Sequence, residues 1–200
     1  MTTAGKTRVA EIQRKTAETD ISLSLVLDGT GMASIDTGVG FLNHMLTLFT
    51  VHGGFDLSIS ARGDLDVDDH HTVEDVGICL GQAFSRALGD KGGIRRYGSS
   101  YVPMDETLAR VVIDFSNRPY LYFGVDLPDR KVGTFDTALA KEFLRALALH
   151  GGITMHVDVL HGENAHHIIE AVFKATARAM ADAAAKRPGD GSVLSSKGAL

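Results

Sequence analysis

Apolar and polar residues alternate along several short stretches of the first half of the chain, a period typical of half-buried β-strands. Other stretches place apolar residues three and four positions apart, which is the period of an amphipathic helix. We predict strands at residues 21–27, 32–36 and 55–61, and helices at residues 41–51 and 71–88. An Asp-Gly-Thr-Gly turn joins the first two strands, which are expected to form a hairpin. The predicted order of this half is ββαβα.

The second half repeats this order of periods. Its strands are predicted at residues 108–115, 120–125 and 153–160, and its helices at residues 137–149 and 166–185. Between the halves, residues 89–106 are rich in glycine and basic residues and read as a connection. We therefore expect an α+β fold made of a duplicated ββαβα unit, with halves at residues 1–95 and 96–186 that form one compact domain. Residues 187–200 lack periodicity and are expected to form a C-terminal tail.

The last helix of each half begins with the same polar motif. His70-His71-Thr72-Val73-Glu74 in the first half returns as His166-His167-Ile168-Ile169-Glu170 in the second. Residues four apart share one face of a helix, so each copy can direct an imidazole and a carboxylate to one point. Imidazole and carboxylate without thiolate form a ligand set for divalent ions such as Mn, Fe or Ni. The two copies therefore predict two metal ions.

An earlier helix of each half offers one more candidate ligand. His44 and Glu142 are polar residues on otherwise apolar stretches. The complete candidate set leaves about four ligands for each ion, and thus positions open for substrate or water. Its members are His44, His70, His71, Glu74, Glu142, His166, His167 and Glu170. For Glu142, a solvated carboxylate on the helix surface is the alternative.

Adjacent histidines on a helix diverge by about 100°. His70 and His71 are therefore expected to bind different ions. Because the ligands leave a helix end in two directions, we also expect that the metal sites are completed across subunit contacts.

The composition narrows the class of protein. The chain is 44% hydrophobic and 22% charged, as globular chains are, and its formal net charge of -5 offers no basic face for nucleic acid. It contains no run of about 18 apolar residues, so we expect no membrane span. The polar residues 1–8 predict no secretory signal. The single cysteine, Cys79, lies in an apolar run and is expected to be buried, and a reducing cytoplasm is the expected location.

Short motifs spread from about Val9 to Leu200 resemble those of the imidazoleglycerol-phosphate dehydratase family, an enzyme family of histidine biosynthesis. These motifs are Arg14-Lys15-Thr16-Ala17-Glu18-Thr19, Phe41-Leu42-Asn43-His44-Met45, Asp69-His70-His71-Thr72-Val73-Glu74-Asp75, Gly89-Asp90-Lys91-Gly92-Gly93-Ile94-Arg95-Arg96, Pro103-Met104-Asp105-Glu106, Gly162-Glu163-Asn164-Ala165-His166-His167 and Ser195-Ser196-Lys197-Gly198. So many matches in one order make the resemblance specific.

The resemblance implies a fold like that of ribosomal protein S5 domain 2, with two sheets and helices packed on one face. It also implies a homo-oligomer of 24 subunits with two Mn²⁺ ions in each active site, at subunit contacts. The implied reaction is dehydration of D-erythro-imidazole-glycerol phosphate to imidazole acetol phosphate. Many members have His where this chain has Glu142. Since Mn²⁺ accepts oxygen ligands, the metal role is retained for this carboxylate.

The resemblance further implies roles for individual residues. Glu18 matches a substrate-contacting glutamate and is expected to act as acid and base. Further catalytic roles are expected for Glu74, Glu170, His71 and His167, and substrate contacts for Glu18, His44, His52, His70, Arg96, Arg118, His167, Ser195, Ser196 and Lys197. Cations and hydroxyl groups suit a phosphate ester, and we expect the tail to order over bound substrate. A disordered tail is the alternative.

The hydrogen that such an enzyme removes from carbon is not acidic. Two metal ions on the two imidazole nitrogens would stabilise an imidazolate, whose electrons can expel the hydroxyl group on the neighbouring carbon. Two other functions fit the metal residues alone, namely a dinuclear metallohydrolase and a non-catalytic assembly protein held together by metal. Neither accounts for Arg96, Arg118 and Lys197 beside them.

Overall fold

The computed structural model describes residues 8–189 and 191–200. Residues 1–7 of the expected first half and residue 190 of the expected tail lie outside the described residues. In the described part of the chain, no helix combines the length and the apolar character needed to cross a membrane.

The first half contains one four-stranded sheet in the order β1-β2-β4-β3. Its strands are β1 (Val9–Lys15), β2 (Thr19–Val26), β3 (Ala33–Asp36) and β4 (Asp56–Gly63). Strand β2 runs antiparallel to both β1 and β4, whereas β3 runs parallel to β4. Alternate residues such as Leu23 and Ile59 are buried, so the period of two in the sequence places one face of this sheet against the core.

The second half repeats this sheet in the order β5-β6-β10-β7. Its strands are β5 (Tyr97–Met104), β6 (Thr107–Asp114), β7 (Tyr120–Gly124) and β10 (Thr154–His161), and a short ribbon is formed by β8 (Lys131–Val132) and β9 (Phe135–Asp136). Strand β6 is antiparallel to β5 and β10, and β7 is parallel to β10. The same order and directions in both sheets confirm the duplicated α+β fold.

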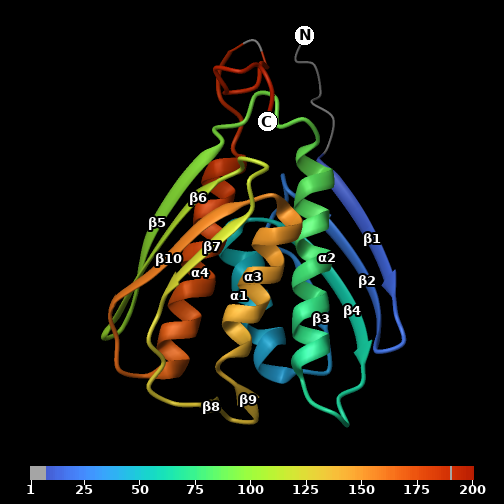
Figure 1. The fold of residues 1–200 in the computed structure, drawn as a ribbon, viewed down its shortest axis with the longest axis vertical. Helices are drawn as coiled ribbons and strands as arrows, with labels where there is room; N and C mark the ends of the chain where they lie inside the picture. The colour runs from blue at the N-terminus through green and yellow to red at the C-terminus, as the bar shows by residue number, and fades with distance from the viewer. Residues whose placement is uncertain (1–7, 190) are drawn as a thin grey trace.

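The helices lie between the two sheets (Figure 1). They are α1 (Gly40–Gly53), α2 (His70–Leu88), α3 (Leu139–Gly151) and α4 (Ala165–Ala184). Helix α2 packs on β1 and β2, and α4 packs on β5 and β6. Each of them also meets a helix of the other half, since α2 contacts α3 and α4 contacts α1. The two halves therefore share one core, which includes Phe49, Phe84, Phe143 and Phe173.

Two glycines allow α2 and α3 to approach closely. A Cβ atom at Gly77 would lie 2.7 Å from the carbonyl oxygen of Phe143, and one at Gly81 would lie 2.7 Å from that of Leu147. These separations are shorter than van der Waals contact, so a larger residue at either position would force the helices apart. The glycines thus set one contact between the halves.

Two details differ from the prediction. The segment at residues 32–36 does not form a hairpin with the strand before it, because β1 and β4 occupy both edges of β2 and β3 pairs with β4 instead. Strands β1 and β5 are absent from the prediction. β5 lies within the glycine-rich stretch that we expected to be a connection, where Gly98 faces the backbone of α4. Each half therefore contains the expected ββαβα order preceded by one further strand, and the second half also has the β8–β9 ribbon, which was not predicted.

Candidate metal centre

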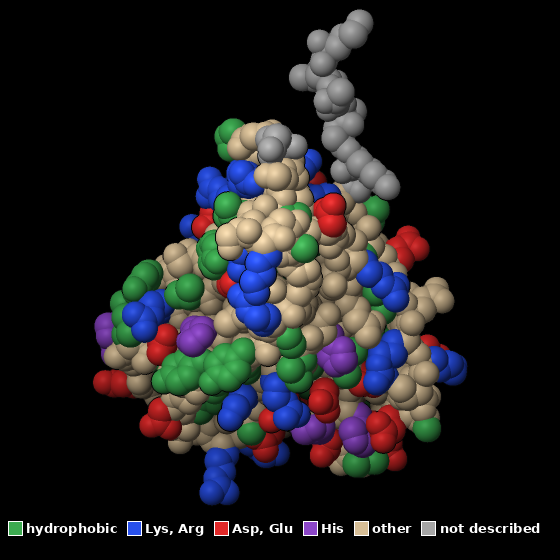
Figure 2. All heavy atoms as spheres, turned by 45° about the horizontal axis from the view of Figure 1, so that its top comes forward, with side chains coloured by type: hydrophobic (Ala, Val, Ile, Leu, Met, Phe, Trp, Pro, Cys, Tyr) green, Lys and Arg blue, Asp and Glu red, His purple; other side chains and the backbone are tan. Residues whose placement is uncertain are grey.

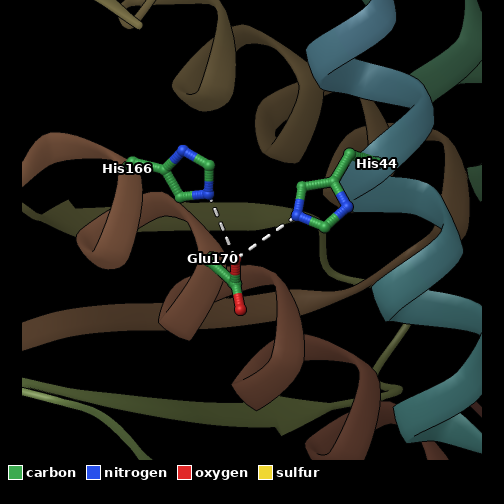
Figure 3. Close-up of side chains that lie close together, drawn as sticks. All are labelled: His44, His166 and Glu170. Carbon is green, nitrogen blue, oxygen red and sulfur yellow. Dashed lines mark hydrogen bonds and ion pairs between the residues drawn. The ribbon is translucent and has the colours of Figure 1, made fainter.

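A compact group of possible metal ligands joins α1 to the start of α4 (Figure 3). In this α1–α4 cluster, Nε2 of His44 lies 3.4 Å from Oε2 of Glu170, and Nε2 of His166 lies 3.2 Å from the same oxygen. One ligand atom from each of the three residues lies within 4.8 Å of the others, which is the spacing at which a single ion could be held. The cluster combines a ligand of the first half with two of the second.

Local structure fixes the second-half members of this cluster. The side chain of Asn164 accepts hydrogen bonds from the backbone N–H groups of His166 and His167, so it caps α4 where the motif begins. Glu170, one turn later, is only 6% exposed. Burial alone would raise the pKa of Glu170, but its bonds to Lys174, His166 and His44 hold that pKa below the usual range. The carboxylate is therefore ionised and able to bind a cation.

The equivalent residues of the other helix pair form a looser group. In this α2–α3 cluster, Nε2 of His70 lies 3.5 Å from Oε2 of Glu74. Arg145 lies between the two carboxylates, 2.6 Å from Glu142 and 3.5 Å from Glu74. His70 and Glu142 line one open cavity of about 460 Å³. The α2–α3 cluster therefore has the expected donors around a cavity, together with a cation that already pairs with two of them.

The second histidine of each motif faces a different carboxylate. Nδ1 of His71 lies 2.9 Å from Oδ2 of Asp64, and Nδ1 of His167 lies 2.8 Å from Oε2 of Glu106. These hydrogen bonds raise the pKa of both histidines. Within each motif the two imidazole rings are nearly perpendicular, at 86° and 83°. Adjacent histidines thus serve different surroundings, as the helical period predicts.

The residues that we expected to contact a phosphate lie together in a pocket beneath the tail. This tail pocket has a volume of about 370 Å³, and its lining includes Arg96, Arg118, Ser195, Ser196 and Lys197. Both oxygens of Asp114 accept hydrogen bonds from Arg96, which also donates to the backbone oxygen of Leu194. Arg118 is more exposed and lies 3.5 Å from Asp114. Figure 2, in which this end is turned toward the viewer, shows Lys and Arg side chains exposed around it.

The tail pocket and the α1–α4 cluster lie at opposite ends of α4. His166 is in the first turn of this 20-residue helix, whereas the backbone N–H of Arg96 donates to the carbonyl of Ala183 near its end. A helix of that length spans about 30 Å. Within one chain, the two groups are therefore too far apart to contact one small molecule.

The other expected site residues occupy separate positions. Glu18 lies in the turn between β1 and β2, and its carboxylate is 3.8 Å from Nε2 of His71. His52 is exposed at the end of α1 and belongs to neither cluster. Three further residues beside the motifs have no predicted role, namely Asp64, Glu106 and Arg145. For Glu106 a signal existed, because it belongs to one of the motifs that carry the family resemblance.

The fold and the clusters define a duplicated α+β protein with histidine and carboxylate groups suited to divalent cations. Comparison with known proteins is more specific, because the imidazoleglycerol-phosphate dehydratase family model matches residues 37–180. The enzyme of that name from Desulfotalea psychrophila is 60% identical over 195 residues, covering 98% of this chain and 98% of the relative. The one from Bacillus subtilis is 60% identical over 193 residues, covering 96% of this chain and 100% of the relative.

Solved structures agree with these relatives. A crystal structure of imidazoleglycerol-phosphate dehydratase from Staphylococcus aureus matches with a TM-score of 0.82 and 49% identity, over 90% of this chain and 99% of that one. A structure of the Pyrococcus furiosus protein in complex with (S)-C348 matches with a TM-score of 0.83 and 39% identity, over 94% and 100%. The chain belongs to the imidazoleglycerol-phosphate dehydratase family.

Proposed function

We propose that this protein dehydrates D-erythro-imidazole-glycerol phosphate to imidazole acetol phosphate in histidine biosynthesis, as a cytoplasmic enzyme. Membership of the family supports the reaction. The observation that carries it is the tail pocket, where two arginines, a lysine and two serines gather. Guanidinium, ammonium and hydroxyl groups are donors that suit a phosphate ester.

The cofactor that we propose is Mn²⁺, with two ions in each active site. The donors of the α1–α4 cluster fit such an ion, because two imidazoles and an ionised carboxylate lie within reach of one point. We assign His44, His70, His71, Glu74, Glu142, His166, His167 and Glu170 as ligands. Bound ions would supply Lewis-acid stabilisation of negative charge on the imidazole of the substrate.

Glu18 is the residue that we propose to move protons. Its side chain is half-exposed, lies beside His71 and accepts no hydrogen bond from another described side chain, so it is free to reach a substrate. We assign further catalytic roles to Glu74, Glu170, His71 and His167. Replacing Glu18 by Gln should lower turnover while the metal content stays unchanged, and full activity in this variant would exclude the role.

We propose that each active site combines residues of different subunits in a homo-oligomer of 24 chains. The separation of the tail pocket from the α1–α4 cluster along α4 supports this, because one substrate cannot reach both within a chain. Mixed assemblies of Arg118→Ala and His166→Ala chains should regain activity that neither variant has alone. Failure of mixed assemblies to regain activity would contradict a shared site. The mass of the assembly, measured in solution, should equal 24 chains of 21.3 kDa each.

We propose that the tail at residues 187–200 covers the bound substrate, beyond a compact domain made of residues 1–95 and 96–186. Arg96, which lines the tail pocket, donates a hydrogen bond to the backbone oxygen of Leu194 in the tail. This contact supports a tail that lies over the pocket. Deleting residues 195–200 should raise KM sharply, because Ser195, Ser196 and Lys197 are lost from the pocket. An unchanged KM would exclude this role.

The deciding experiment is an assay for imidazole acetol phosphate with metal-free protein, before and after addition of Mn²⁺. Formation of this product only with metal is the expected result. Release of inorganic phosphate instead would indicate a metallohydrolase. Binding of metal without any turnover would indicate an assembly protein.

A further inference from the structure

Two carboxylates outside the proposed ligand set contact the metal-binding motifs at equivalent atoms. Asp64 lies 2.9 Å from Nδ1 of His71, and Glu106 lies 2.8 Å from Nδ1 of His167. They come from different places in the duplicated unit, because Asp64 follows β4 whereas Glu106 lies between β5 and β6. In both halves a carboxylate thus contacts Nδ1 of the second histidine of the motif, although the carboxylate comes from a different segment in each half.

Glu106 is held firmly in its orientation. Its Oε1 atom accepts hydrogen bonds from the backbone N–H groups of Glu163 at 3.2 Å and Asn164 at 3.0 Å, and from the hydroxyl group of Thr107 at 3.0 Å. With this oxygen occupied, Oε2 is left to face His167. A carboxylate oxygen can only accept a hydrogen bond, so Nδ1 of His167 must donate.

The position of the proton on the imidazole ring decides whether Nε2 can bind a metal ion. In a neutral imidazole that carries its proton on Nδ1, Nε2 has a free lone pair. Metal-ligating histidines are commonly held in one tautomer by such a hydrogen bond from the other ring nitrogen. We propose that Glu106 and Asp64 are positioning residues, which hold His167 and His71 with Nδ1 protonated so that Nε2 faces the cation. This inference rests on the metal binding proposed above.

Glu18 and Glu106 are equivalent residues of the two halves, but only Glu106 hydrogen-bonds to a histidine of the motif. Glu18 and Glu106 occupy equivalent turns, since each directly precedes a buried threonine that begins the next strand, Thr19 or Thr107. In the first half, Asp64 hydrogen-bonds to Nδ1 of His71, whereas the Glu18 carboxylate lies 3.8 Å from Nε2 and makes no hydrogen bond to the ring. In the second half, Glu106 itself binds the histidine. Only one of the two duplicated glutamates is therefore left to exchange protons with substrate.

The Glu106→Gln variant tests this inference with little change to the backbone. Its amide oxygen can still accept the bonds from Glu163 and Asn164, but its NH₂ group then faces His167. A donor at that place requires Nδ1 to accept, which moves the proton to Nε2. We expect Mn²⁺ affinity to fall about 10- to 100-fold. The control is Glu163→Gln, which removes a charge from an exposed neighbour and should leave affinity unchanged.

A second measurement reads the tautomer without metal. Solid-state ¹⁵N NMR of the metal-free protein, labelled at histidine, should show the His167 signal change from an Nδ1–H to an Nε2–H tautomer in Glu106→Gln, with assignment from a His167→Gln sample. An unchanged tautomer together with wild-type Mn²⁺ affinity would overturn the inference. If wild-type protein binds Mn²⁺ but forms no imidazole acetol phosphate, the proposed reaction fails while this test still applies. Asp64→Ala removes the acceptor that faces Nδ1 of His71 and should likewise lower Mn²⁺ affinity, which keeps the test open if Glu106→Gln does not fold.

Discussion

The α1–α4 and α2–α3 clusters occupy equivalent places in a duplicated fold, yet they differ in one ligand and in the cation that pairs with their carboxylates. The first has His44 where the second has Glu142. In the first, Lys174 pairs with one oxygen of Glu170 and leaves the other oxygen to the two imidazoles. In the second, Arg145 pairs with both carboxylates. Duplication preserves the place of a site but not its electrostatic environment.

The largest effect on metal binding is expected from a ligand of the α1–α4 cluster. Replacing His166 by Ala should lower Mn²⁺ affinity by at least about 100-fold, because a ligand is lost rather than a residue that orients one. His150→Ala removes an exposed histidine of α3 and serves as the control. Equal metal content in both variants, measured after dialysis, would show that the α1–α4 cluster is not a metal site.

The next largest effect is expected from the glycine contact that joins α2 to α3. A Cβ atom at Gly77 would lie 2.7 Å from the carbonyl oxygen of Phe143, next to Glu142. Gly77→Ala should therefore lower the free energy of unfolding by about 1–3 kcal/mol. It should also weaken the α2–α3 cluster and leave the α1–α4 cluster intact. Equal loss of both metal ions would mean that the two clusters do not form independently.

A smaller effect is expected at the ligand that distinguishes the clusters. Glu142→Ala should weaken the Mn²⁺ ion of the α2–α3 cluster by only about tenfold, because Arg145 already competes with the ion for this carboxylate. Glu142→His should retain the ion, because imidazole is a ligand of the same metals. Titration of metal-free protein with Mn²⁺ measures both. If the alanine variant binds Mn²⁺ as tightly as the wild-type protein, Glu142 is a solvated carboxylate on the helix surface and not a ligand.

Arg145 should have a modest effect of opposite sign. Its ion pairs with Glu74 and Glu142 must be released when a cation binds, so Arg145→Met should tighten the second Mn²⁺ ion by roughly threefold. Solvent screening keeps this gain small, because the side chain is 49% exposed. Lys141→Met, on the same helix, should change nothing. Weaker binding in Arg145→Met would show that this arginine supports the site.

Cys79 is buried in α2 and should not react with alkylating reagents in the native protein, so its reactivity reports whether α2 is loosened. Burial raises the pKa of its thiol to about 11, so little thiolate exists near neutral pH. An alkylating reagent should leave the native protein unmodified at pH 8. The Gly77→Ala variant should react faster if the added methyl group loosens α2. Rapid alkylation of the wild-type protein would contradict the burial.

Much of the fold could be predicted from local patterns. The periods of two and 3.6 identified β2, β4, β6, β10 and the four helices named above, because each reflects one face turned toward the core. Strand pairing was less accessible. Residues 32–36 follow a turn that favours a hairpin, but the pairing of β2 with β1 and β4 decides otherwise. The sequence of β3 alone does not show that both edges of β2 are already paired, so it does not reveal that β3 pairs with β4.

The sequence by itself determined the candidate ligands and the tail residues. The repeated His-His-x-x-Glu motif needs only the helical period to direct one imidazole and one carboxylate together. Which ligands meet was decided by tertiary packing, because the contact of α1 with α4 brings His44 of one half to His166 and Glu170 of the other. The carboxylates that bind Nδ1 of His71 and His167 were also decided there. Hydrogen bonds between distant segments depend on how the sheets and helices pack, and no local period in the sequence records that.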